Sequence, residues 1–126
     1  MKTKSIGQFE EEVSQAVVRF EKEYMGRGPL EARTHLIDDL VVVRLKGVLT
    51  PAELTLTGSG DRGRDLIKQV RQQLIETGAA ALSAAVARIV GAEVVSMHTD
   101  LSTRTGERVI VFTLAARGGP KSVPPT

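Results

Sequence analysis

The sequence predicts an α+β fold, a two-layer sandwich in which two main helices cover one face of a four-stranded antiparallel sheet. Apolar residues recur at helical spacing over residues 5–25 and 62–90, and a pair of strand-like segments follows each of these stretches. The predicted order is therefore α-β-β-α-β-β. We expect residues 1–115 to form a single domain and residues 116–126, rich in glycine and proline, to be a disordered C-terminal tail.

The first predicted helix starts at Ser5 and ends at a glycine corner. Its apolar stripe consists of Ile6, Phe9, Val13, Ala16, Val17, Phe20 and Tyr24. Glycine adopts the left-handed conformation easily, and proline cannot donate a helical hydrogen bond. Gly26, Gly28 and Pro29 therefore form the predicted corner, and we expect Gly28 to adopt the left-handed conformation.

The first predicted hairpin pairs residues 31–37 with residues 40–49 across the acidic turn Asp38-Asp39. Two adjacent aspartates are more economically a turn pair than a calcium site. The inward side of the second strand is predicted to carry Val41, Val43 and Leu45. Thr50 and Glu53 then form a capping box, with Pro51 at the first position of a short helix.

The second long helix is predicted over residues 62–90, with Gly78 near its middle. Gly78 allows either close approach of another helix or a kink. The apolar stripe of this helix is predicted to be Leu66, Ile67, Val70, Leu74, Ile75, Leu82, Val86 and Ile89. The second hairpin pairs residues 93–100 with residues 108–115, and its inward face is predicted to carry Val95, Met97, Ile110, Phe112 and Leu114.

Two histidines, the only ones in the chain, occupy matching places in the two halves. His35 lies seven residues after Gly28, and His98 lies seven residues after Gly91. This spacing, together with the repeated order of elements, predicts that one αββ unit is used twice.

Strand alternation directs a second set of residues to the outer face of the sheet. This set is Arg33, His35, Arg44, Lys46, Ser96, His98 and Asp100. Three interpretations are open: an ordinary solvated face, self-association of two copies through this face or an edge strand, or a small-anion site with charge-assisted hydrogen bonds. From the half-polar sheet and the small size we expect a homodimer.

Composition argues against several classes of function. With no cysteine, disulfides and thiolate metal sites are excluded, which fits a reducing cytoplasm. Arg117 and Lys121 lie in the predicted tail, and removing them from the 17 basic residues leaves 15 against 15 acidic ones. A neutral body with few aromatic residues is not typical of nucleic-acid binding.

The sequence also predicts neither an enzyme nor a membrane-inserted protein. The first residues are too polar for a signal peptide, and no uninterrupted apolar run approaches the ~20 residues of a membrane span. No motif assembles a nucleophile with a base. We therefore expect no catalytic residues, no metal site and no cofactor.

Three segments carry a resemblance to a known family: EKEYMGRGP (21–29), RLKGVLTPAE (44–53) and HTD with TGERV (98–100 and 105–109). With them the chain, over roughly residues 5–115, resembles the MpsC family of small bacterial proteins, linked by name to a sodium-translocating, membrane-potential-generating system. The resemblance carries no catalytic residues. It implies a non-catalytic, soluble accessory or regulatory subunit, cytoplasmic or peripheral at the membrane through a transporter subunit. The alternative function is a dimeric small-anion sensor that uses the basic outer face of the sheet.

Overall fold

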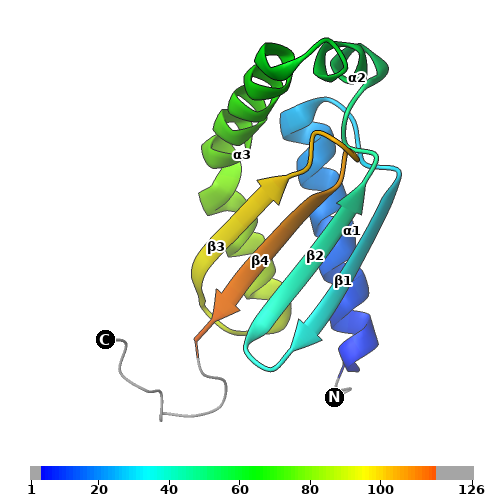
Figure 1. Cartoon of the computed structure of the whole chain (residues 1–126). Helices are drawn as coiled ribbons and strands as arrows, with labels where there is room; N and C mark the ends of the chain where they lie inside the picture. Colours follow the sequence, from blue (N-terminus) through cyan, green and yellow to red (C-terminus); the bar gives the residue numbers. More distant parts are fainter. Residues whose placement is uncertain (1–3, 116–126) are drawn as a thin grey trace.

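Two long helices, α1 (Ile6–Met25) and α3 (Asp61–Val90), lie behind one face of a four-stranded sheet in the computed structural model, which describes residues 4–115 (Figure 1). The remaining elements are β1 (Glu31–Ile37), β2 (Leu40–Lys46), the short α2 (Pro51–Thr57), β3 (Val94–Leu101) and β4 (Arg108–Leu114). All neighbouring strands are antiparallel, in the order β1-β2-β4-β3. The predicted α+β sandwich is confirmed; the predicted tail lies outside the described residues.

Helix α1 starts with a capping box and ends at Gly26. The Ser5 hydroxyl accepts a hydrogen bond from the Gln8 backbone N–H at 3.1 Å, and the Gln8 side chain accepts one from the Ser5 N–H at 2.7 Å. Gly26 has a φ of 89°, whereas Gly28 has no positive φ. The prediction that Gly28 adopts the left-handed conformation is therefore wrong, because the first glycine after the helix already makes the turn.

The first hairpin has the predicted two-residue turn, in which Asp38 adopts a φ of 55°. Strand β2 ends at Lys46, three residues before the predicted end at 49. The chain turns away at Gly47, which has a φ of 68°, and the following Val48 and Leu49 are buried outside the strand. Thr50 then caps α2 through the predicted capping box.

Helix α3 is rotated relative to the predicted orientation. Its buried stripe is Gly63, Ile67, Arg71, Ile75, Gly78, Leu82, Val86 and Val90. Leu66, Val70 and Leu74 were predicted to join the core, but their exposed fractions are 50%, 45% and 37%.

Gly78 confirms the close approach of two helices. A Cβ atom at this position would collide with the Phe20 ring and lie 2.9 Å from the Tyr24 ring, both on α1. The absence of a side chain at Gly78 therefore sets how closely α3 packs on α1.

The second hairpin differs from the predicted one at Val95. The register pairs Val94 with Leu114 and then Ser96 with Thr113, so Val95 is the extra residue of a β-bulge. It is 64% exposed, and its predicted inward position is wrong. Met97, beyond the bulge, packs against the core as predicted.

By length and composition α3 reaches what a membrane-spanning helix requires, and it is the one helix to do so within residues 4–115. Its buried stripe contributes Ile75, Leu82, Val86 and Val90 to the hydrophobic core beneath the sheet. We therefore interpret α3 as the core helix of the domain.

Candidate functional site

The helices leave one face of the sheet uncovered, which we call the outer face (Figure 1). The predicted outward residues alternate along their strands with the inward residues, so all of them lie on the outer face. Their chain neighbours Thr34, Val43 and Leu45 are buried beneath the sheet, as strand alternation requires. The period-two pattern therefore placed the outward residues correctly.

The two histidines occupy one cross-strand row of the outer face. His35 pairs with Val42, Val42 with Val111, and Val111 with His98. Three strand spacings separate the outer strands by about 14 Å, so the histidines cannot ligate one metal ion. The neighbouring row reads, in strand order, Arg33, Arg44, Val109 and Asp100.

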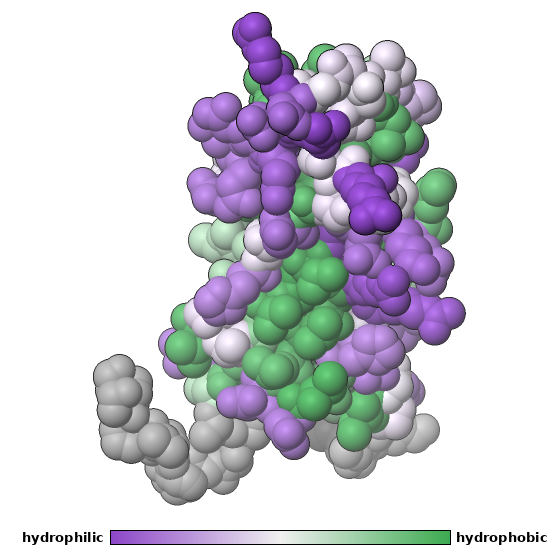
Figure 2. Space-filling model, in the orientation of Figure 1, coloured by the Kyte–Doolittle hydropathy of each residue, from purple (hydrophilic) through white to green (hydrophobic). Residues whose placement is uncertain are grey.

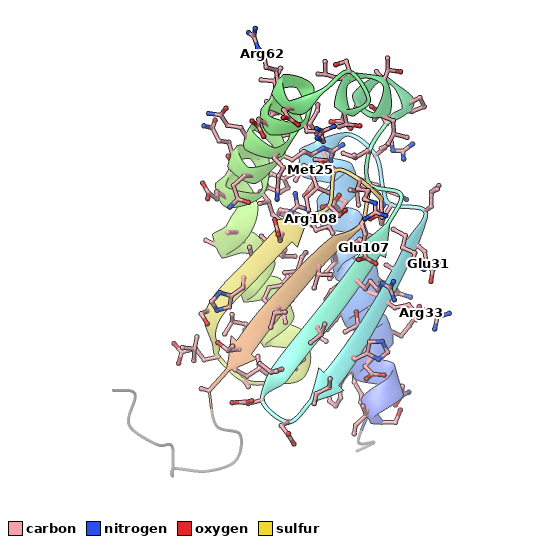
Figure 3. The ribbon with its side chains drawn as sticks, in the orientation of Figure 1. Met25, Glu31, Arg33, Arg62, Glu107 and Arg108 are labelled. Carbon is pink, nitrogen blue, oxygen red and sulfur yellow. The ribbon has the colours of Figure 1, made fainter. Side chains whose placement is uncertain are left out.

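Both arginines of the outer face are ion-paired with acids, and its lysine lies opposite one. Arg33 donates to Glu31 at 3.0 Å, and Arg44 is ion-paired with Glu107. Lys46 lies opposite Glu31 in the strand register. Figure 3 shows Glu31 and Arg33 at the β1 edge of the sheet. Because acids compensate these cations, the face is less basic than the sequence predicts.

Asp100 is the one acidic residue among the predicted outward residues, and it lies on the edge strand β3. The Lys68 ammonium lies 3.0 Å from its carboxylate, and the Leu101 backbone N–H donates to the same oxygen at 2.9 Å. The hydrogen bond from Lys68, followed by that from Leu101, lowers the pKa of Asp100. Asp100 therefore carries a stable negative charge at the edge opposite Arg33.

An apolar patch fills the middle of the outer face between these charged residues. Figure 2 shows a continuous hydrophobic area over the strands, bordered by hydrophilic side chains. The outward apolar residues of β1, β2 and β4 are Ile37, Leu40, Val42, Val109 and Val111, which we call the outer-face patch. Ile37 is 52% exposed and the other four residues are half-buried, so the patch is accessible along the middle of the face, and such apolar patches can mark interaction surfaces.

A second exposed apolar surface lies on the helices. Leu66, Val70 and Leu74 recur every four residues along α3, so they lie on one side of it. We call these three residues the helical stripe.

Three buried charged residues were missed by the sequence analysis: Glu21, Arg71 and Arg108, each at most 2% exposed. Helical spacing could have indicated the first two. Glu21 lies four residues after Val17, and Arg71 lies midway between Ile67 and Ile75, so both fall within buried stripes. Arg108 is in phase with the inward residues of β4.

Arg71 holds the start of α2 in place. It donates to the Glu53 carboxylate at 2.9 and 2.5 Å and to the Val48 carbonyl at 2.9 Å. Burial alone would raise the pKa of Glu53, but hydrogen bonds from Arg71 and Thr50 outweigh burial and lower it. This pair therefore has a structural role that joins α3 to α2.

Glu21 and Arg108 lie in the interior between the helices and the sheet. Arg108 donates to the Thr99 hydroxyl at 2.8 Å. Burial raises the pKa of Glu21, and the attraction of Arg108 and Arg71 opposes this shift only in part. Glu21 Oε2, Arg71 Nη1 and Arg108 Nε have no hydrogen-bond partner among the described residues.

Comparison with known proteins establishes the family. The family described as "Na+-translocating membrane potential-generating system (MpsC)" matches residues 5–116. The chain belongs to the MpsC family. It is also 47% identical over 111 residues to the uncharacterized protein YbcI of Bacillus subtilis (strain 168), covering 88% of this chain and 89% of that protein. No solved structure matches the chain.

Proposed function

We propose that this MpsC-family chain is a non-catalytic accessory or regulatory subunit of a membrane ion-transport system and acts by protein–protein contact. The observation that carries the proposal is the rotation of α3. This helix buries Arg71 and leaves Leu66, Val70 and Leu74 at the surface. Three apolar side chains in one exposed stripe are an unfavourable arrangement for a helix surface that faces only water, whereas the buried Arg71 is paired with Glu53 inside the domain.

The spacing of the helical stripe fits a helical partner. Apolar residues at every fourth position present a ridge that packs into the groove of another helix. The family description names a sodium-translocating system, so we propose a membrane subunit of such a system as the occupant. The chain would then be cytoplasmic and reach the membrane through this partner.

A small-anion sensor has less support. Arg33 and Arg44 are each paired with a glutamate, and Asp100 shares their row. These acids would repel an anion at the outer face.

Site-specific crosslinking in membranes tests the proposal. A photoreactive residue at position 70 should crosslink to a membrane subunit of an ion-transport system, identified by mass spectrometry. Leu66→Lys in the same chain should reduce this crosslink at least tenfold, because a lysine would have to be desolvated at the contact. Ile6→Lys is the matched control: it adds the same charge at a 63% exposed apolar residue near the start of α1.

The control variant should crosslink like the parent. If position 70 gives no membrane crosslink, or if Ile6→Lys and Leu66→Lys reduce the crosslink equally, the helical stripe is not the contact and the proposal fails.

A further inference from the structure

We propose that two copies of this chain pack face to face through the outer face, about a two-fold axis that runs parallel to the strands between β2 and β4. The inference concerns a different surface from the helical stripe and does not depend on the proposed function. It rests on how apolar and charged residues are distributed across the strand rows.

The proposed axis brings the apolar residues of the two copies together. Rotation about it exchanges β1 with β3 and β2 with β4, because these strands lie symmetrically about the axis. Val42 of one copy then faces Val111 of the second copy at the centre of the contact. The outer-face patch of each copy is covered by the patch of the other copy, which removes the apolar area of both patches from water.

The same rotation pairs opposite charges at both edges. Arg33 and Asp100 end one row at opposite edges of the sheet, so Arg33 of each copy faces Asp100 of the other. Their side chains are 70% and 81% exposed, and each remains accessible beside its partner within the chain. Aligned sheets cross at roughly 30°, which displaces edge residues by about 4 Å, within reach of an arginine.

A two-fold axis across the strands would not give this match. It would place β1 against β1 and β3 against β3, leaving Arg33 and Asp100 at opposite edges of the contact. The charge pattern therefore selects the axis parallel to the strands.

The small size of the outer face predicts weak binding between the two copies. Four strands of about seven residues present a flat area of about 450 Å². A standard interface buries ~800 Å² of accessible surface per partner, so a flat face of this size predicts a weak, reversible dimer.

Charge reversal within one chain tests the geometry. Arg33→Asp and Asp100→Arg should each weaken dimerisation about tenfold at low salt, because two attractive contacts per dimer become repulsive. The double variant restores opposite charges across the interface and should regain the parent dissociation constant. Sedimentation equilibrium between 1 and 200 µM measures all four proteins.

A second pair of variants tests the apolar part of the contact. Val111→Lys should leave the chain monomeric at 200 µM, because it places a charge at the centre of the outer-face patch. Leu66→Lys, on the helical stripe, should dimerise like the parent. Far-ultraviolet circular dichroism confirms that each variant is folded.

Three outcomes would overturn the proposal: a parent chain that stays monomeric at 200 µM, a double variant that does not recover, or a dimer dissociated by Leu66→Lys. In contrast, loss of the membrane crosslink in a chain that still dimerises would contradict only the proposed function.

Discussion

At the scale of single residues, the end of α1 depends on which glycine is left-handed. Gly26 has a φ of 89°, and a Cβ atom there would meet no other atom of the described part of the chain within 4 Å. A substitution at Gly26 is therefore strained by backbone conformation alone. At Gly28 the backbone is not left-handed, and a Cβ atom would lie 3.2 Å from the flexible Lys22 side chain.

Replacing each glycine by alanine separates these effects. Gly26→Ala should lower the free energy of unfolding by about 1 kcal/mol, the cost of a left-handed alanine. Gly28→Ala should cost less, because the end of Lys22 can move aside. Both variants reduce the entropy of the unfolded chain, although Pro29 already restricts residue 28, so their difference reports mainly the folded state. Urea denaturation measures the free energy of unfolding of the two variants. A larger loss of stability for Gly28→Ala than for Gly26→Ala would contradict the assignment of Gly26 as the left-handed residue.

Sequence could predict this corner but not its conformation. Gly26 and Gly28 both satisfy the rule that a glycine follows a helix, and nothing local distinguishes them. Only the direction in which the chain leaves α1 to begin β1 decides which of the two is left-handed.

At the scale of elements, the sequence predicted α3 but not its rotation. Leu66, Val70 and Leu74 form as regular a stripe as Ile67 and Ile75, so hydrophobic periodicity alone cannot choose between them. Contacts distant in sequence make the choice, such as the bond from Arg71 to Glu53 across 18 residues.

On the outer face, too, the local sequence pattern predicted some features, and contacts between distant segments decided the others. Strand alternation predicted the outward residues, because side chains in a strand alternate strictly between the two faces. The bulge at Val95 and the pairing of Arg44 with Glu107 depend on register between strands, which alternation does not specify. The outer-face patch and the pairing of arginines with glutamates on this face therefore could be recognised only in the assembled sheet.

The packing of α1 on α3 gives a prediction at this scale. Gly78→Ala should destabilise the domain by about 1–3 kcal/mol, because the new methyl group would overlap the Phe20 ring. Gly7→Ala is the control on α1, where a Cβ atom would lie 3.9 Å from the Ser5 hydroxyl and otherwise meet open space.

Gly7→Ala should be neutral or stabilising by up to about 1 kcal/mol, through helix propensity. Thermal and urea unfolding of both variants test the pair. Equal stability of Gly78→Ala and the parent would show that the two helices can separate without cost.

At the scale of the whole molecule, both long helices and the sheet each contribute a charged residue to the interior. Glu21 comes from α1, Arg71 from α3 and Arg108 from the sheet, and all three lie in the interior. Burial of such groups is costly unless they are fully paired. Within residues 4–115 Glu21 accepts no hydrogen bond at Oε2, so its ionisation is expected to affect the stability of the domain.

The sign of this effect follows from the pKa of Glu21, which burial raises above its ordinary value of 4.5 in spite of Arg108 and Arg71. A raised folded-state pKa contributes stability that is fully present below the unfolded pKa and is lost as the pH rises through the folded pKa. The parent should therefore lose stability from this group as the pH rises above 4.5.

Glu21→Gln keeps the shape of the side chain but cannot ionise, so its stability relative to the parent should increase from pH 4.5 to pH 8. Glu23→Gln, at an exposed position of the same helix, removes the same charge and is the matched control. Urea denaturation of the three proteins at several pH values between 4.5 and 8 makes the comparison. A Glu21→Gln difference that is constant with pH would show that Arg71 and Arg108 offset the cost of burying the carboxylate, and a difference that is larger at pH 4.5 would show that they exceed it; either result contradicts the raised pKa.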